Sequence, residues 1–85
     1  MSSAIDINTN SSAVIILRNL NLTGFPDAGS GIFTTGFSSG TLIVQHCNIS
    51  GFTTGYGIYF TPSSGRGLLQ VSDTSLYNNY NAIRR

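Results

Sequence analysis

One pattern of apolar and polar residues occurs three times in this 85-residue chain, at a spacing of 27 residues. The three copies occupy residues 15–25, 42–52 and 69–79. A small residue followed by isoleucine also recurs at spacings of 27, 26 and 25 residues, as Ala4-Ile5, Gly31-Ile32, Gly57-Ile58 and Ala82-Ile83. A period in the twenties with short apolar runs indicates a solenoid, whose coils stack on one another, rather than a globule with a central core.

Each repeat divides into three short segments that favour strand. No run is long enough for a helix, and Val, Ile, Leu, Thr and Tyr dominate the segments. The chain also contains no Lys and no Glu, two residues that favour helix. We therefore expect an all-β fold. The predicted strands are 13–17, 41–44 and 68–71 for the first segment, 20–23, 47–50 and 74–77 for the second, and 31–34, 57–60 and 82–85 for the third.

Stacking aligns equivalent residues of successive coils into apolar columns, which form the predicted core. Strands that pair in a sheet lie about 4.8 Å apart, so each aliphatic side chain packs on its counterpart in the next coil. Their burial, at about 1.5–3 kcal/mol for each side chain, is the main favourable term for folding. The columns are Ile15, Leu42 and Leu69; Leu17, Val44 and Val71; Leu20, Cys47 and Thr74; Leu22, Ile49 and Leu76; and Ile5, Ile32, Ile58 and Ile83.

Two sets of bend residues separate the predicted strands. Asn, Asp, His and Gly tolerate positive φ better than other residues, and a left-handed residue turns a strand sharply in one step. We therefore expect left-handed backbone at every one of these positions. They are Asn19, His46 and Asp73 between the first and second strands, and Gly24, Gly51 and Asn78 after the second.

The segments Val44–Gly51 and Val71–Asn78, followed by Gly57-Ile58 and Ala82-Ile83, resemble the repeat of pectin-lyase-like proteins. The resemblance covers roughly residues 4–85 and implies a short right-handed parallel β-helix of about three coils, with three strands per coil and a period of about 26–27 residues. That family includes polysaccharide lyases, glycoside hydrolases, esterases, phage tailspikes and adhesins, so the resemblance specifies fold far more closely than function. We take residues 1–85 as one β-helix domain, either complete or a fragment of a longer solenoid.

Charge and hydropathy exclude several classes of partner. The chain has four Arg and three Asp, for a formal net charge of +1. The arginines are scattered apart from Arg84-Arg85, so no basic stripe can neutralise several phosphates, and we expect no nucleic-acid partner. No apolar stretch is long enough to span a bilayer, and the N-terminus lacks the pattern of a signal peptide. We expect no membrane span, and localisation stays open.

The carboxylates give no support for catalysis. Glycoside hydrolysis ordinarily uses two convergent carboxyl groups, whereas Asp6, Asp27 and Asp73 fall on different parts of the predicted coil. A calcium-dependent lyase would need a cluster of acidic ligands, and none is present. Cys47 is the single cysteine, and its place in an apolar column favours a structural role over a nucleophilic one. We predict no catalytic, cofactor or metal site and no intrinsic hydrolase or lyase activity.

His46 is the most unusual polar residue, because stacking places it between Asn19 and Asp73. Asp73 and the imidazole could form a functional pair. The simpler interpretation, which we favour, is a bend ladder in which all three residues serve the same left-handed turn and form hydrogen bonds along the stack.

The predicted outer surface carries apolar residues where polar ones are expected. Alternation directs Ile16 and Ile43 outward from the first strand, and Phe33 and Tyr59 outward from the third. Asp6 and Arg84 lie at either end of the latter row. Exposed apolar columns indicate a partner, so these four residues are the candidate interaction surface. The alternative is that a loop carrying Phe37 folds back over the coil.

Two functional hypotheses follow. The first, which we favour, is a structural or interaction module that self-associates as a homo-oligomer, because both ends of the stack expose apolar columns and unpaired backbone. The second is a carbohydrate-binding or carbohydrate-processing β-helix that uses Phe33, Tyr59 and nearby loops, since aromatic rings stack on sugars.

Overall fold

The computed structural model describes residues 3–9, 12–37, 39–62 and 66–84, and every regular element in these ranges is a β-strand. The strands form three sheets in which all neighbours are parallel. Sheet A contains β1 (Ile5–Thr9), β4 (Ile32–Gly36), β7 (Tyr56–Tyr59) and β10 (Asn81–Arg84). Sheet B contains β2 (Val14–Arg18), β5 (Thr41–Gln45) and β8 (Leu68–Ser72), and sheet C contains β3 (Asn21–Thr23), β6 (Asn48–Ser50) and β9 (Ser75–Tyr77).

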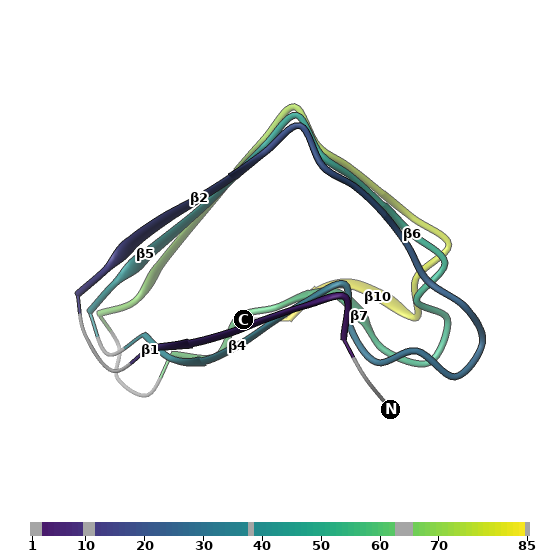
Figure 1. The fold of residues 1–85 in the computed structure, drawn as a ribbon, viewed down its shortest axis with the longest axis horizontal. Helices are drawn as coiled ribbons and strands as arrows, with labels where there is room; N and C mark the ends of the chain where they lie inside the picture. The colour runs from purple at the N-terminus through teal and green to yellow at the C-terminus, as the bar shows by residue number, and fades with distance from the viewer. Residues whose placement is uncertain (1–2, 10–11, 38, 63–65, 85) are drawn as a thin grey trace.

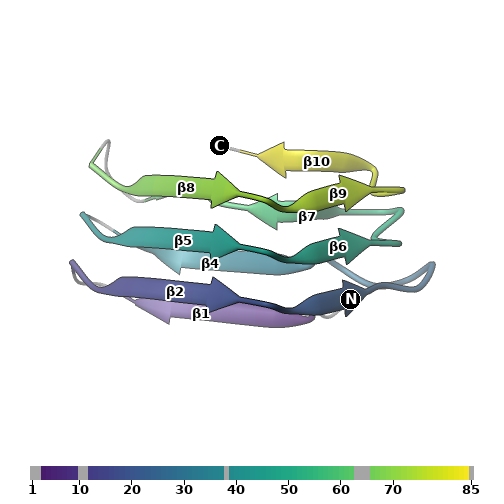
Figure 2. The ribbon, with the colours of Figure 1, turned by 90° about the horizontal axis from the view of Figure 1, so that it is seen from above.

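The chain passes through sheets A, B and C in turn, and each such passage is called a coil below. Coil 1 contains β1 to β3, coil 2 contains β4 to β6, and coil 3 contains β7 to β9. Viewed along the stack, the coils superimpose on a triangular outline with one sheet on each side (Figure 1). Viewed from above, the coils lie in layers, and β10 adds a fourth strand to sheet A (Figure 2). This arrangement is consistent with a parallel β-solenoid.

Strand pairing confirms four of the five predicted columns; the fifth, of Leu20, Cys47 and Thr74, lies between the strands. Ile5, Ile32, Ile58 and Ile83 are register partners across sheet A. Sheet B aligns the two columns that contain Leu42 and Val44, and sheet C aligns the column that contains Ile49. The strand boundaries differ from the prediction by one or two residues. In sheet C each strand begins one residue later than predicted, and β7 ends at Tyr59 rather than at residue 60. Residue 85 lies outside the described ranges.

Five of the six predicted bend residues have left-handed backbone. The φ angles are 60° at Asn19, 52° at His46, 48° at Asp73, 85° at Gly51 and 55° at Asn78. The prediction for Gly24 is wrong, because its φ is not in the left-handed region. A side chain at this position is excluded by a steric clash instead, because a Cβ on Gly24 would lie 2.7 Å from the carbonyl oxygen of Gly51.

The core combines the columns with aromatic residues from the corners. Ile32, Leu42, Val44, Ile49 and Ile58 are completely buried. Phe37, Phe52, Phe60 and Ala28 close the corners of the triangle and are also buried, although the sequence analysis did not place them in the core. The hydroxyl of buried Thr34 has a hydrogen-bond partner, because it donates to the carbonyl oxygen of Tyr59 at 2.9 Å. Within the described ranges there is no membrane-spanning helix.

Candidate functional site

The outer face of sheet A presents a row of four side chains that crosses the sheet. Asp6, Phe33, Tyr59 and Arg84 are register partners on β1, β4, β7 and β10. The rings of Phe33 and Tyr59 stack with centroids 4.8 Å apart and planes inclined by 23°. The guanidinium carbon of Arg84 lies over the Tyr59 ring, 5.9 Å from its centroid. The sequence therefore placed this row correctly, including the charged residue at each end.

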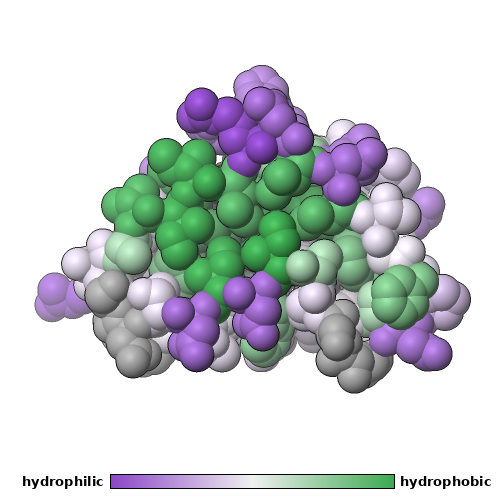
Figure 3. All heavy atoms as spheres, in the orientation of Figure 1, coloured by the Kyte–Doolittle hydropathy of each residue, from purple (hydrophilic) through white to green (hydrophobic). Residues whose placement is uncertain are grey.

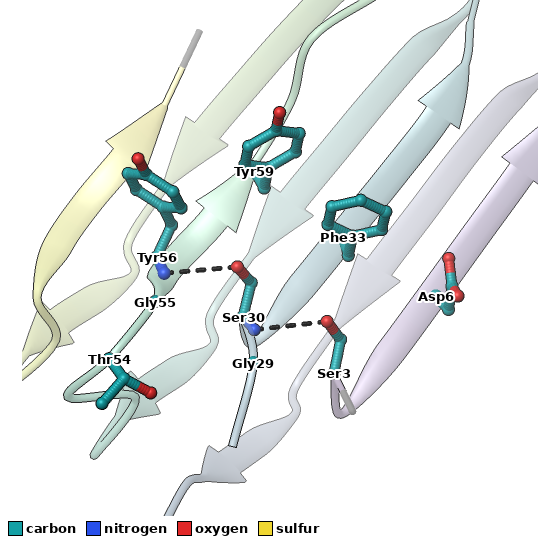
Figure 4. Close-up of a pocket in the computed structure, with 9 residues that line it drawn as sticks. All are labelled: Ser3, Asp6, Gly29, Ser30, Phe33, Thr54, Gly55, Tyr56 and Tyr59. Atoms are coloured by element: carbon teal, nitrogen blue, oxygen red, sulfur yellow. Dashed lines mark hydrogen bonds between the residues drawn. The ribbon is translucent and has the colours of Figure 1, made fainter. Parts of the chain in front are cut away.

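A groove of about 480 Å³ lies beside the row and opens to solvent (Figure 4). Its second side is built where the loops between sheets C and A enter sheet A. The hydroxyl of Ser3 accepts a hydrogen bond from the backbone N–H of Ser30, and the hydroxyl of Ser30 accepts one from Tyr56, both at 3.2 Å. These bonds hold Ser3, which precedes β1, the loop before β4 and the start of β7 in register. The lining residues are Ser3, Asp6, Gly29, Ser30, Phe33, Thr54, Gly55, Tyr56 and Tyr59.

The groove offers surfaces suited to binding. It is surrounded by the two stacked rings, the Tyr56 ring and one carboxylate. The centroid of the Tyr56 ring lies 5.4 Å from that of Tyr59. Sequence reasoning found Phe33, Tyr59 and Asp6 from strand alternation but missed Ser3, Ser30 and Tyr56. The signal for the two serines was available, since they stand 27 residues apart, one residue before Ala4-Ile5 and Gly31-Ile32.

The loop carrying Phe37 does not cover the row on sheet A. Phe37 is completely buried with the core and packs edge-to-face against Phe60, with ring centroids 5.4 Å apart. Its φ is 51°, and the preceding Gly36 has a φ of 88°, so the chain turns sharply at the corner between sheets A and B. Phe33 and Tyr59 remain partly exposed. The alternative that this loop shields the candidate surface is therefore not the observed arrangement.

The outer face of sheet B is apolar over much of its area. Ile16 is 51% exposed, its register partner Ile43 is partly exposed, and Gln70 completes the same row. Val14 is 63% exposed and Leu68 is 50% exposed in the neighbouring row. Sequence analysis identified Ile16 and Ile43 but omitted Val14 and Leu68, which the same alternation would have found.

The bend ladder lies at the apex of the triangle between sheets B and C. Asn19, His46 and Asp73 follow β2, β5 and β8, and backbone hydrogen bonds link Asn19 to Gln45 and His46 to Ser72 of the next coil. The Nε2 atom of His46 lies 3.7 Å from a carboxylate oxygen of Asp73, and both side chains are mostly exposed. An exposed pair at this separation contributes little to stability, so the backbone turn is the main role that the geometry gives these residues.

The remaining reactive side chains lie apart from one another. Cys47 is buried, with its sulfur 3.2 Å from the carbonyl oxygen of Gln45, as its column position predicted. Asp6 lies on β1, Asp27 in the loop after β3, and Asp73 at the apex. Within the part of the chain that the structure describes, no three His, Cys, Asp or Glu residues form a group that could hold a metal ion.

No protein-family description, curated protein or solved structure matches this chain. The candidate sites therefore stand on the geometry given above.

Proposed function

We propose that this chain is a non-catalytic module of the right-handed parallel β-helix type, with the pectin-lyase-like repeat, that self-associates through the ends of its stack. The observation that carries the proposal is the change in burial along each column. Ile32, Leu42, Val44 and Ile49 of coil 2 are completely buried, whereas the equivalent residues of coil 1 are half-buried. Apolar surface of this kind is stabilised when a second molecule covers it.

Unpaired backbone at the ends supports the same proposal. In each sheet the first and last strands have a neighbour on one side only. Such edges offer unpaired N–H and C=O groups that can pair with strands of another molecule. The apolar face of sheet B, with Ile16 and Ile43, supplies additional surface for association.

Light scattering at several protein concentrations tests the proposal. We expect a mass above the 9.0 kDa of the single chain, rising with concentration. The variant Ile16→Ser distinguishes association through the ends of the stack from association through the outer face of sheet B. Ile16 is half exposed on that face, and its replacement leaves the columns intact. A mass of one chain at all micromolar concentrations would overturn the proposal.

Carbohydrate binding is the second candidate, and the groove on sheet A is the observation that favours it. Stacked rings of Phe33 and Tyr59 beside the Asp6 carboxylate and the Tyr56 ring combine an apolar platform with polar groups, as sugar recognition requires. Nuclear magnetic resonance titration with neutral and acidic oligosaccharides tests it. Shifts confined to the groove residues, and lost in Tyr59→Ala but kept in Ile16→Ala, are expected. Absence of shifts for every sugar would eliminate this candidate.

A further inference from the structure

The two ends of the stack differ in the residues that they expose. At the coil 1 end six half-buried aliphatic residues pack against the core, namely Ile5, Ile7, Ile15, Leu17, Leu20 and Leu22. Figure 3 shows this end, where a broad apolar area fills the triangle formed by β1, β2 and β3. At the other end Thr74 takes the place of Leu20, and Leu69 is only 7% exposed. The coil 1 end therefore has the larger apolar surface to cover.

The extra strand β10 prevents the two different ends from joining. Sheet A has four strands, whereas sheets B and C have three, so β10 stands above β8 and β9 (Figure 2). If β2 and β3 of a second copy paired with β8 and β9, β1 of that copy would occupy the position of β10. If β1 paired with β10 instead, sheets B and C would each lack a strand at the junction. Head-to-tail stacking thus cannot continue all three sheets.

The coil 1 end has no such obstacle to meeting a second coil 1 end. All three of its strands belong to the same layer, and sheets B and C slope away from the apex on either side (Figure 1). A twofold axis through the apex lays the side of sheet B on that of sheet C, where the five residues of β2 meet the three of β3. It places β1 antiparallel to β1 of the second copy and β2 opposite β3. An antiparallel edge pair satisfies the backbone groups that the edges leave unpaired.

We infer that two copies of this chain form a closed, twofold dimer through their coil 1 ends. The inference rests on the proposed self-association and specifies which surface is used. A triangle with the two longer extents of the molecule, 32 and 25 Å, has an area of roughly 400 Å², which gives a total of roughly 800 Å² for the two copies. That total is below the roughly 1,000 Å² expected of a stable interface, so the dimer is weak and reversible. An isologous contact also closes the assembly, whereas a head-to-tail contact would build a polymer.

A matched pair of variants tests which end is used. Leu17 and Val71 occupy the same column, at opposite ends, and both are half-buried. A lysine at either site can extend from the open end of its column to water in the monomer, but Leu17→Lys places two charges in the interface. We expect Leu17→Lys to raise the dimer dissociation constant by about tenfold or more, and Val71→Lys to change it by less than about twofold. Circular dichroism checks that both variants remain folded.

Cross-linking tests the symmetry, and needs no change to the core beyond Cys47→Ala. Asn8 on β1 and Gln70 on β8 are exposed positions on edge strands at opposite ends. With a short bismaleimide, Asn8→Cys alone is expected to give covalent dimers and Gln70→Cys alone to give none. Covalent dimers from Gln70→Cys but none from Asn8→Cys, or a stronger effect of Val71→Lys than of Leu17→Lys, would overturn the twofold arrangement while leaving self-association intact. The twofold arrangement would also be overturned if both lysine variants associated as strongly as the original chain.

Discussion

Coils 1 and 2 share one sequence pattern, yet they differ in how deeply that pattern is buried. Leu22 and Ile49 are register partners in sheet C, but Ile49 is completely buried and Leu22 is half-buried. The same holds for Ile15 and Leu42 in sheet B. Since the side chains are alike, the difference comes from the number of neighbouring coils. Burial in a stack is thus set by position, and an end coil resembles a middle coil only when something covers it.

The largest expected effect comes from a charge in the middle coil. Ile49→Asp places a carboxylate at a completely buried site with no cationic partner, at a cost of about 4 kcal/mol or more, which prevents folding. Leu22→Asp, in the same column of coil 1, leaves the carboxylate at the open end and is expected to fold. Circular dichroism and urea denaturation compare the two. Equal loss of structure in both variants would contradict the difference between coils 1 and 2.

The two glycines that follow β3 and β6 should respond differently to asparagine. Gly51 has a φ of 85°, which asparagine tolerates, as Asn78 does at the equivalent site of coil 3 with a φ of 55°. Gly24→Asn instead forces a Cβ within 2.7 Å of the Gly51 carbonyl oxygen. We expect a destabilisation of about 2–3 kcal/mol for Gly24→Asn and of about 1 kcal/mol for Gly51→Asn, measured by urea denaturation. The reverse order would show that the contact with the Gly51 carbonyl oxygen does not set the requirement for glycine at position 24.

The smallest effect is expected at the bend ladder. His46→Asn retains a residue that tolerates the left-handed turn and removes the exposed pair with Asp73, whose atoms lie 3.7 Å apart. We expect the free energy of unfolding to change by less than about 0.5 kcal/mol. His46→Val is the control, because a β-branched residue is strained at the φ of 52° and should cost more. A loss in His46→Asn as large as that in His46→Val would assign the imidazole a role beyond the turn.

The repeat period predicted the parts of the fold that recur in every coil. The columns within the strands, the strand order along each coil and five of the six predicted bends all depend on residues at fixed intervals, so a 27-residue spacing was sufficient to identify them. The outward row of Asp6, Phe33, Tyr59 and Arg84 followed from alternation within sheet A.

The corners could not be predicted in the same way, because their roles change from coil to coil. Phe25 and Phe52 are equivalent in sequence, but Phe25 is 62% exposed and Phe52 is 1% exposed. Asn79 takes the equivalent place in coil 3, where its side chain accepts a hydrogen bond from the Phe52 N–H and donates one to the Ile49 carbonyl oxygen. The prediction of left-handed backbone at Gly24 is wrong for a related reason. Its requirement for glycine comes from the backbone of the next coil, which no local pattern records.

Amide hydrogen exchange, followed residue by residue at low and high protein concentration, tests most directly whether the coil 1 end is the surface that associates. Exchange reports the opening of individual backbone amides, so it separates the two ends of the stack in one experiment. We expect the outward-pointing amides of β1, β2 and β3 to become more protected as concentration rises, and those of β8 and β9 to stay unchanged. Protection that is independent of concentration at both ends, or that rises at β8 and β9 instead, would contradict this expectation.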